Sequence, residues 1–312
     1  MQRPAKMRGM RRPASTAILS RAFVLLVLAA RGSVLLAAEP EGAKPVPVPK
    51  AITFPSSVRQ AEFFIVKVLG AGGASGTCRW MGKTYLLLPS GDDLETMLAV
   101  PMTTSPGKGT VRIALDIPAG SAELAAPVRI LRRRFGIQRL TMKKETLALY
   151  SAPGVEDEYR AIRSALATES ADRLWQAPFT QPCAGRIGTS FGLHRIINRK
   201  DKYRHRGVDL SAPKGTPVTA SNAGTVTLAR EDFALHGRTI VIDHGQGLSS
   251  LYIHLDSITV VEGQNVQKGE VIGAVGDSGA ATGPHVHWAF YIHGICVDPF
   301  AVIKFPWPAP SP

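Results

Sequence analysis

Acidic side chains are absent from the first 38 residues, although these contain seven basic ones. The apolar run at 22–30 is interrupted by Arg31, so it falls short of the roughly 20 residues needed to span a membrane. Basic, apolar and then small residues follow one another up to Ala38, which predicts a secretory signal peptide at 1–38. We therefore expect an exported protein of the periplasm or cell envelope, or a secreted one, with membrane association only if this segment stays uncleaved.

Two other export routes lack their signatures. No cysteine follows the apolar run until Cys78, which argues against a lipid-anchored lipoprotein. The Arg11-Arg12 pair lacks the surrounding residues of a twin-arginine signal. The ordinary secretory route remains.

Cysteine is scarce in the chain as a whole. The three cysteines, Cys78, Cys183 and Cys296, do not stand at metal-ligand spacing. In an exported protein two of them can pair, which leaves one thiol free. Because Cys183 and Cys296 bracket the last domain, we predict a disulfide between them, with buried free cysteines as the alternative.

An excess of acidic residues is also lacking, and the whole chain has a formal net charge of +13. Residues 1–38 hold seven of the 37 basic residues and none of the 24 acidic ones, so a mature chain that starts at Glu39 would carry +6. This charge suits an anionic polymer such as the cell-wall sacculus. Nucleic acid is equally charged, but it is in the wrong compartment for an exported protein. A merely soluble basic surface is the alternative.

Composition divides the remaining chain into segments. Residues 39–50 are rich in proline and predict an extended linker. Between 51 and 142, short alternating or β-rich runs are separated by Gly, Pro, Ser and Asp, which predicts an Ig-like β-sandwich module. A spacer and a regulatory or wall-binding module are both compatible with this sequence.

The segment 143–181 predicts a helical connector. Apolar side chains recur in it at helical spacing after Pro153, which predicts an amphipathic helix at about 154–174. Its apolar positions are Val155, Tyr159, Ile162 and Leu166. The helix either packs one face on a domain or is a solvated link.

From 182 to 303, glycines punctuate short apolar strands. This pattern predicts a mainly antiparallel β domain, because a doubly wound α/β domain would need helical stretches that are missing here. An irregular tail is expected at 304–312. The fold class of the chain is thus mainly β.

Histidine and aspartate gather in three short motifs of this last domain. They are His205-Arg-Gly-Val-Asp209, Tyr252-Ile-His254-Leu255 and Gly283-Pro284-His285-Val286-His287. A catalytic zinc takes three nitrogen or oxygen ligands from the protein and keeps one position open, so five candidates leave two histidines for chemistry. One motif alone would more often be structural, and it is their co-occurrence that favours a site. The other histidines are expected to be structural: His194, His236, His244 and His293.

Backbone geometry restricts how these motifs can form one site. His285 and His287 are two residues apart, so on a strand they point to the same face, roughly 6.6 Å from each other. His205 and Asp209 would lie roughly 13 Å apart on a straight strand, which is too far for one ion. We therefore expect a bend between them, which Gly207 permits, at a strand edge that enters a loop.

The chain from about 184 to 300 resembles the lysostaphin-type (LytM-like) zinc metalloendopeptidases of peptidoglycan. The resemblance runs through the three motifs, the Leu-Ser-Ala-Pro-Lys-Gly-Thr-Pro-Val that follows Asp209, and the Gly-Asp-Ser-Gly-Ala-Ala-Thr that precedes Gly283. It implies one zinc ion per chain, bound by His205, Asp209 and His287. It also implies that His254 and His285 orient the water and stabilise the transition state.

The sequence therefore predicts a monomeric zinc metalloendopeptidase that hydrolyses peptide stems or cross-links of peptidoglycan. No His-Glu-x-x-His sequence is present, so histidine is the expected general base. A catalytically silent, wall-binding activator of other hydrolases is an alternative, and the intact set of five residues argues against it. A lipoyl-type or phosphotransferase carrier is suggested by Val261-Glu-Gly-x-x-Val-x-Lys-Gly, but the export signal argues against a carrier.

Overall fold

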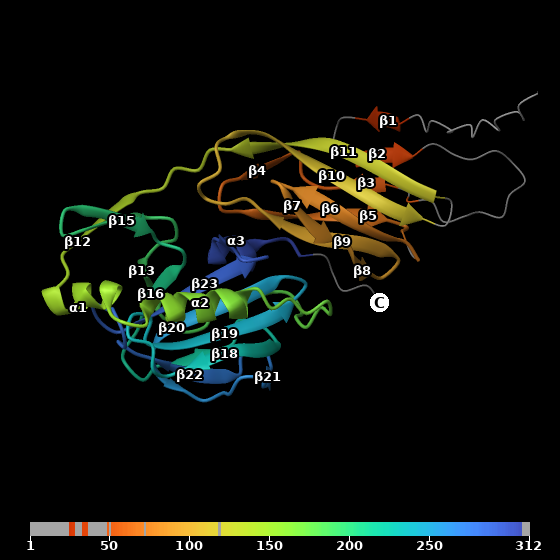
Figure 1. Cartoon of the computed structure of the whole chain (residues 1–312). Helices are drawn as coiled ribbons and strands as arrows, with labels where there is room; N and C mark the ends of the chain where they lie inside the picture. The colour runs from red at the N-terminus through yellow and green to blue at the C-terminus, as the bar shows by residue number, and fades with distance from the viewer. Residues whose placement is uncertain are drawn as a thin grey trace, which may run out of the picture.

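The computed structural model describes residues 25–28, 33–36, 49, 51–71, 73–117 and 120–307. Two β-rich domains lie side by side in Figure 1, and a helical connector joins them in the chain. The predicted signal peptide and Pro-rich linker lie largely outside the described residues, apart from two short strands. Over the part of the chain that is described, no helix combines the length and the apolar composition that a membrane span requires.

The amino-terminal domain is a sandwich of two β-sheets, as the sequence predicted. One sheet has the order β1 (Leu25–Leu28), β2 (Ser33–Leu36), β3 (Ala51–Thr53), β5 (Phe63–Leu69), β9 (Asp93–Ala99) and β8 (Leu88–Ser90). The other has the order β4 (Ser57–Arg59), β11 (Gly120–Leu131), β10 (Gly107–Ile117), β6 (Ser75–Trp80) and β7 (Lys83–Leu86). Neighbouring strands are antiparallel except β4 and β11, which are parallel.

Alternate residues of β5 serve two different cores. Phe64 and Val66 are buried between the two sheets of the sandwich, where the Phe64 ring meets Trp80 edge to face. Phe63 points to the other side and joins the core of the carboxy-terminal domain. Successive side chains of a strand face opposite ways, so one strand can stabilise both domains. The sandwich is therefore docked on its neighbour rather than tethered to it.

Aromatic side chains of the carboxy-terminal tail add to this contact between domains. Phe305 and Trp307 follow α3 (Pro299–Lys304) and have ring centroids 4.5 and 5.5 Å from that of Phe63. Trp307 also meets Trp175 at 4.5 Å. The tail is irregular at these residues, yet it is packed between the two domains.

The carboxy-terminal domain is built on one antiparallel sheet, as predicted. Its strand order is β13 (Arg186–Thr189), β16 (Val208–Ser211), β23 (His285–Ile292), β20 (Leu248–Ile258), β19 (Arg238–Gly245), β18 (Gly224–Arg230) and β21 (Asn265–Val266). Three short strands extend it: β17 (Pro217–Thr219), β22 (Val271–Val275) and β24 (Ile295–Val297).

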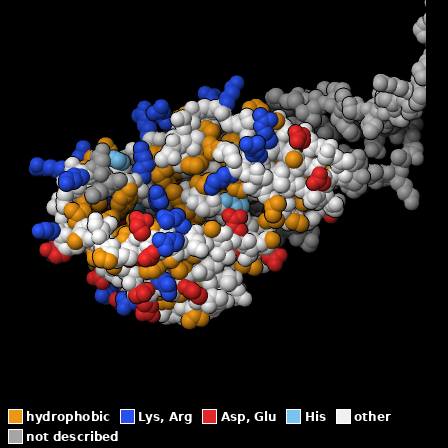
Figure 2. Space-filling model, in the orientation of Figure 1, with side chains coloured by type: hydrophobic (Ala, Val, Ile, Leu, Met, Phe, Trp, Pro, Cys, Tyr) orange, Lys and Arg blue, Asp and Glu red, His pale blue; other side chains and the backbone are white. Residues whose placement is uncertain are grey.

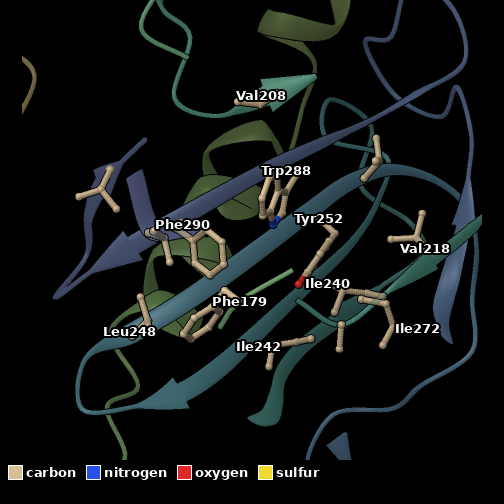
Figure 3. Close-up of a cluster of buried hydrophobic side chains, with 14 of the residues drawn as sticks. Phe179, Val208, Val218, Ile240, Ile242, Leu248, Tyr252, Ile272, Trp288 and Phe290 are labelled. Carbon is tan, nitrogen blue, oxygen red and sulfur yellow. The ribbon is translucent and has the colours of Figure 1, made fainter. Parts of the chain in front are cut away.

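One face of this sheet forms the main core, which Figure 3 shows. Tyr252 of β20 and Trp288 of β23 are fully buried there. The intervening residues, such as Leu251 and Ala289, point to the opposite face and pack in a second cluster. The sheet therefore buries both faces, which explains why its strands are more uniformly apolar than a half-exposed sheet.

The connector contains α1 (Lys144–Ala148), the 3₁₀ turn η1 (Leu149–Ser151) and α2 (Val155–Leu166). Ile162 and Leu166 of α2 pack on the second face of the sheet, where full burial of such a side chain contributes roughly 1.5–3 kcal/mol. The alternative of a solvated helix is therefore wrong.

The predicted extension of this helix to 174 is also wrong. Beyond Leu166 the chain leaves the helix and follows β19, because hydrogen bonds to that strand replace the helical ones. Ser170 N and Oγ both donate to Asp243 Oδ2, and Leu174 N donates to His244 O.

Two further expectations differ from the structure. Residues 137–140, expected in the sandwich, form β12 (Ile137–Leu140), which pairs with β14 (His194–Ile197); β14 in turn pairs with β15 (Lys200–Arg204).

The predicted Cys183–Cys296 disulfide is wrong, since both cysteines are free. Cys183 is buried in the main core, and Cys296 of β24 packs at the edge of both the main core and the second cluster.

Candidate metal centre

Three side chains from separate elements meet in a buried cluster. His205 directly follows β15, and the pairing of β16 with β23 sets Asp209 opposite His287. Asp209 Oδ1 is 2.9 Å from His205 Nε2 and 2.8 Å from His287 Nδ1, and these two ring nitrogens are 2.9 Å apart. The motifs at 205–209 and 285–287 thus contribute to one cluster.

The predicted bend between His205 and Asp209 is confirmed. Their nearest side-chain atoms are 2.9 Å apart, not the roughly 13 Å of a straight strand. Gly207 permits this approach because it has no side chain. A Cβ atom there would lie 2.6 Å from His287 Nε2 and 2.5 Å from Trp288 O. A larger residue at 207 would therefore displace the His287 ring or the β23 backbone.

The cluster fits a divalent cation with mixed nitrogen and oxygen ligands. His205 Nδ1 is 2.9 Å from Ser190 O, and donating to this carbonyl leaves the Nε2 lone pair directed at the cluster. The three ligating atoms are 2.8–2.9 Å apart, close to the roughly 3.3 Å expected around a tetrahedral zinc with bonds of about 2.0 Å. His205, Asp209 and His287 are 1, 7 and 8% exposed, so the protein holds the donors in place.

The second oxygen of Asp209 is occupied by a residue that the sequence did not single out. Arg195 Nη2 donates to Asp209 Oδ2 at 2.6 Å. The same guanidinium donates from Nε to Gln138 Oε1 at 3.0 Å and from Nη1 to Tyr203 Oη at 3.1 Å. Tyr203 Oη lies 3.0 Å from Tyr150 Oη of η1, so the hydrogen-bond chain reaches the connector. No short motif marks Arg195, because β14 and β16 meet only in the tertiary structure.

These contacts keep Asp209 in its anionic form. Burial by itself raises the pKa of the carboxyl group, but its side-chain hydrogen bonds and electrostatic interactions with the imidazoles of His205 and His287 outweigh burial and hold the pKa well below its usual range. For His287, burial lowers the pKa to about 4. Both groups are therefore deprotonated at neutral pH, the form in which they can bind a metal ion.

His254 and His285 lie beside the cluster without belonging to it. His254 Nδ1 is 2.8 Å from Ser278 O, His285 Nδ1 is 2.7 Å from Gly283 O, and the two ring centroids are 5.0 Å apart. His285 Nε2 is 3.9 Å from Asp209 Oδ1. Each ring is thus oriented by a carbonyl on one nitrogen, which leaves the other nitrogen for the site.

The backbone at His254 is in a left-handed conformation, with φ of 65°. It lies where β20 ends its pairing with β23 and begins to pair with β22. Burial, and then the nearby His285 and His287, lower the pKa of His254 to about 3, so the ring is neutral. Non-glycine residues held in this sparsely populated backbone region cluster at functional sites.

The connector also supports His254. Glu158 of α2 is buried, and its carboxylate accepts hydrogen bonds from Ala234 N, Leu235 N, His236 N and His236 Nδ1. His236 O in turn accepts from His254 N at 3.1 Å. His236 therefore has a structural partner, as predicted. His244 and His293 also have local partners, in Ser250 and Glu169.

The geometry agrees with the comparison of the sequence with protein families. The sequence model of Peptidase family M23 matches residues 203–299. The chain contains an M23 peptidase domain. His205, Asp209, His254, His285 and His287 all lie inside the matched residues.

Two curated relatives illustrate the similarity of the M23 domain. The DD-carboxypeptidase/endopeptidase Mpg of Neisseria meningitidis is 42% identical over 120 residues, which are 38% of this chain and 27% of that protein. The peptidoglycan DD-endopeptidase ShyA of Vibrio cholerae is 38% identical over 112 residues, 35% of this chain and 25% of that protein. The chain spans about a quarter of the length of these relatives.

The fold similarity extends beyond the M23 domain. A crystal structure from Pseudomonas aeruginosa, provisionally assigned as a peptidase M23, is 26% identical with a TM-score of 0.57. The match covers 82% of this chain and 94% of that one. Both domains of this chain therefore have counterparts in one solved structure.

Proposed function

We propose that the protein is a zinc-dependent endopeptidase that hydrolyses peptide bonds in the stems or cross-links of peptidoglycan, outside the cytoplasm. The observation that carries this proposal is the meeting of His205, Asp209 and His287 in one buried cluster with two further histidines beside it. Relatives of the M23 domain that are named peptidoglycan endopeptidases support the choice of substrate.

In this proposal His205, Asp209 and His287 hold the zinc ion. Zinc, when bound, supplies a Lewis acid that polarises a carbonyl group and lowers the pKa of a water ligand to about 7. Asp209 offers Oδ1 for this purpose, while Arg195 retains Oδ2. The carboxylate is thereby prevented from rotating away from the two imidazoles.

The remaining two histidines accept and donate protons in this proposal. Because Ser278 O accepts from His254 Nδ1, the Nε2 atom of His254 is free to accept a proton from water. His285, oriented in the same way by Gly283 O, donates to the oxygen of the scissile carbonyl when it is protonated. In this proposal the two imidazoles take the place of the glutamate of a His-Glu-x-x-His motif, which the sequence does not contain.

Digestion of purified sacculi by the full chain, with fragments identified by mass spectrometry, tests this proposal. We expect about one zinc per chain and loss of fragment release after chelation, restored by added zinc. Fragment release that persists after verified metal removal would refute the mechanism. Intact zinc binding without any release would favour the alternative of a silent wall-binding activator.

Substitutions separate the proposed metal ligands from the proton carriers. His287→Ala should lose most zinc affinity and activity together. His254→Ala should keep zinc nearly stoichiometric while turnover falls by roughly 100-fold or more. Zinc analysis of His285→Ala beside His287→Ala decides which member of the pair binds. Zinc loss confined to His285→Ala would reverse the assignment.

A further inference from the structure

A cleft of about 670 Å³ opens where the sandwich, the segment after β11 and the M23 domain meet. Loop 102–106 of the sandwich lines part of it, and arginines line much of the rest: Arg132, Arg133, Arg134 and Arg204. Of the described residues that line it, none is Asp or Glu. Figure 2 shows Lys and Arg side chains over this part of the molecule, including the region where the two domains meet. The cleft is therefore strongly positive.

One of the four arginines has a structural role. Arg133 forms an ion pair through Nη2 with Asp298, and its Cζ atom is 5.4 Å from the Phe135 ring centroid. Its backbone N donates to Gln60 Oε1 at 2.8 Å. Arg133 thus fastens the segment after β11 to both domains, and its charge is neutralised.

The other three arginines keep their charge available. Exposure alternates along the segment, so Arg132 and Arg134 are exposed while Arg133 between them is half-buried. Arg204 stacks on the Phe135 ring, with its Cζ atom 5.4 Å from the ring centroid. Among the described residues, no carboxylate forms an ion pair with Arg132, Arg134 or Arg204. Within the described part of the chain, three guanidinium groups thus line one cleft without a compensating carboxylate.

The wall of this cleft is continuous with the metal centre. Arg204 directly precedes His205 in the chain. Phe135 packs so closely on Gly192 that a Cβ atom there would lie 2.2 Å from the ring. Gly192 N donates to His205 O at 2.8 Å. The cleft and the metal centre are therefore linked through Gly192 and the backbone of Arg204 and His205.

We propose that this cleft binds carboxylate groups of the peptidoglycan strand whose peptide enters the metal centre, and so contributes to substrate affinity. This inference rests on the proposed function. Guanidinium groups bind carboxylates in pairs of parallel hydrogen bonds, and the stacked ring of Phe135 holds Arg204 ready for such a contact. Phosphate groups of other envelope polymers present the same oxyanion chemistry, and the experiment distinguishes the two sources.

The test is binding of the full chain to purified sacculi, measured by pelleting, in a His254→Ala background that prevents digestion. The pair Arg132→Gln and Arg134→Gln should raise the Kd about tenfold, because each partly exposed ion pair contributes roughly three- to fivefold. The matched control is Arg112→Gln with Arg129→Gln. These two are exposed on β10 and β11, remove the same charge from the same domain, and do not line the cleft.

Chemical amidation of the sacculus carboxylates identifies the ligand. Amidation should raise the Kd of the chain with intact arginines about as much as the Arg132/Arg134 substitutions do. It should raise the Kd of the Arg132/Arg134 variant little further. The proposal would be overturned if amidation weakened sacculus binding of the native-arginine chain and of the Arg132/Arg134 variant equally. It would also be overturned if the Arg112/Arg129 control variant bound sacculi as weakly as the Arg132/Arg134 variant. Displacement by inorganic phosphate at constant ionic strength, with no effect of amidation, would assign the cleft to phosphate instead.

A second readout keeps this inference separate from the proposed function. With His254 intact, the Arg132/Arg134 variant should digest sacculi more slowly at low substrate and approach the native rate at saturating substrate, whereas the Arg112/Arg129 control should keep the native rate at both. Arginine-dependent binding without any cleavage would refute the endopeptidase and leave the cleft standing. Cleavage of sacculi that is insensitive to both arginines at every substrate concentration would refute the cleft alone.

Discussion

Replacing Arg195 with Gln should weaken zinc binding without unfolding the protein. The Arg195 guanidinium is the only group among the described residues that donates a hydrogen bond to Asp209 Oδ2, at 2.6 Å. Its side chain is 12% exposed, so water does not readily replace the lost donor. Without Arg195, the Asp209 carboxylate can rotate and share its oxygens between the metal and other partners.

The magnitude follows from the position of Arg195 behind a proposed ligand. Loss of a hydrogen-bonding partner of a metal ligand typically lowers metal affinity by about 10- to 100-fold. This corresponds to roughly 1.4–2.7 kcal/mol of binding free energy. Arg195→Lys should fall between Gln and the native residue, because lysine keeps the charge but cannot also reach Gln138 and Tyr203 through a planar fork.

Competition with a chromophoric chelator measures the zinc Kd directly. The matched control is Arg139→Gln, an exposed residue of β12, the strand that pairs with β14. It removes the same charge one strand away, and its Kd should stay within about twofold of the native value. Circular dichroism of the metal-free variants shows whether the fold is retained. A folded Arg195→Gln variant with native zinc affinity would refute this account of Asp209.

Two predictions concern stability. Glu158→Ala should lower the free energy of unfolding by about 3–5 kcal/mol, because the buried N–H of Leu235 and the partly buried N–H groups of Ala234 and His236 lose their acceptor. Denaturant melts measure this loss, and a value below about 1 kcal/mol would show that water replaces the carboxylate. Burial lowers the pKa of His244 to about 4 from an ordinary value of 6.5, so the unfolded chain binds a proton between these pH values that the folded chain does not. As the pH falls from about 6.5 to about 4, His244 therefore lowers the free energy of unfolding by about 3 kcal/mol. In the His244→Asn variant the free energy of unfolding should fall by about 3 kcal/mol less over the same interval. Equal pH dependence of the native protein and the variant in denaturant melts would contradict this prediction.

Local sequence patterns determined the elements and the candidate ligands of this protein. Alternating apolar residues identified strands because side-chain direction on a strand depends only on parity along the chain. The same parity explains why His285 and His287 share a face, and Gly207 marked the bend because the spacing of His205 and Asp209 required one. These features depend on residues within a few positions of one another, so they can be read before the fold is known.

The tertiary structure decided everything that depends on which segments meet. The helix ends at Leu166 rather than 174, because Asp243 and His244 of a distant strand capture the chain that follows. Arg195 reaches Asp209, and Arg134 faces the same cleft as Arg204, only because separate strands and domains are packed together. Such contacts join residues that have no fixed spacing in the sequence, and their energies arise from burial and hydrogen bonding that exist only in the folded chain.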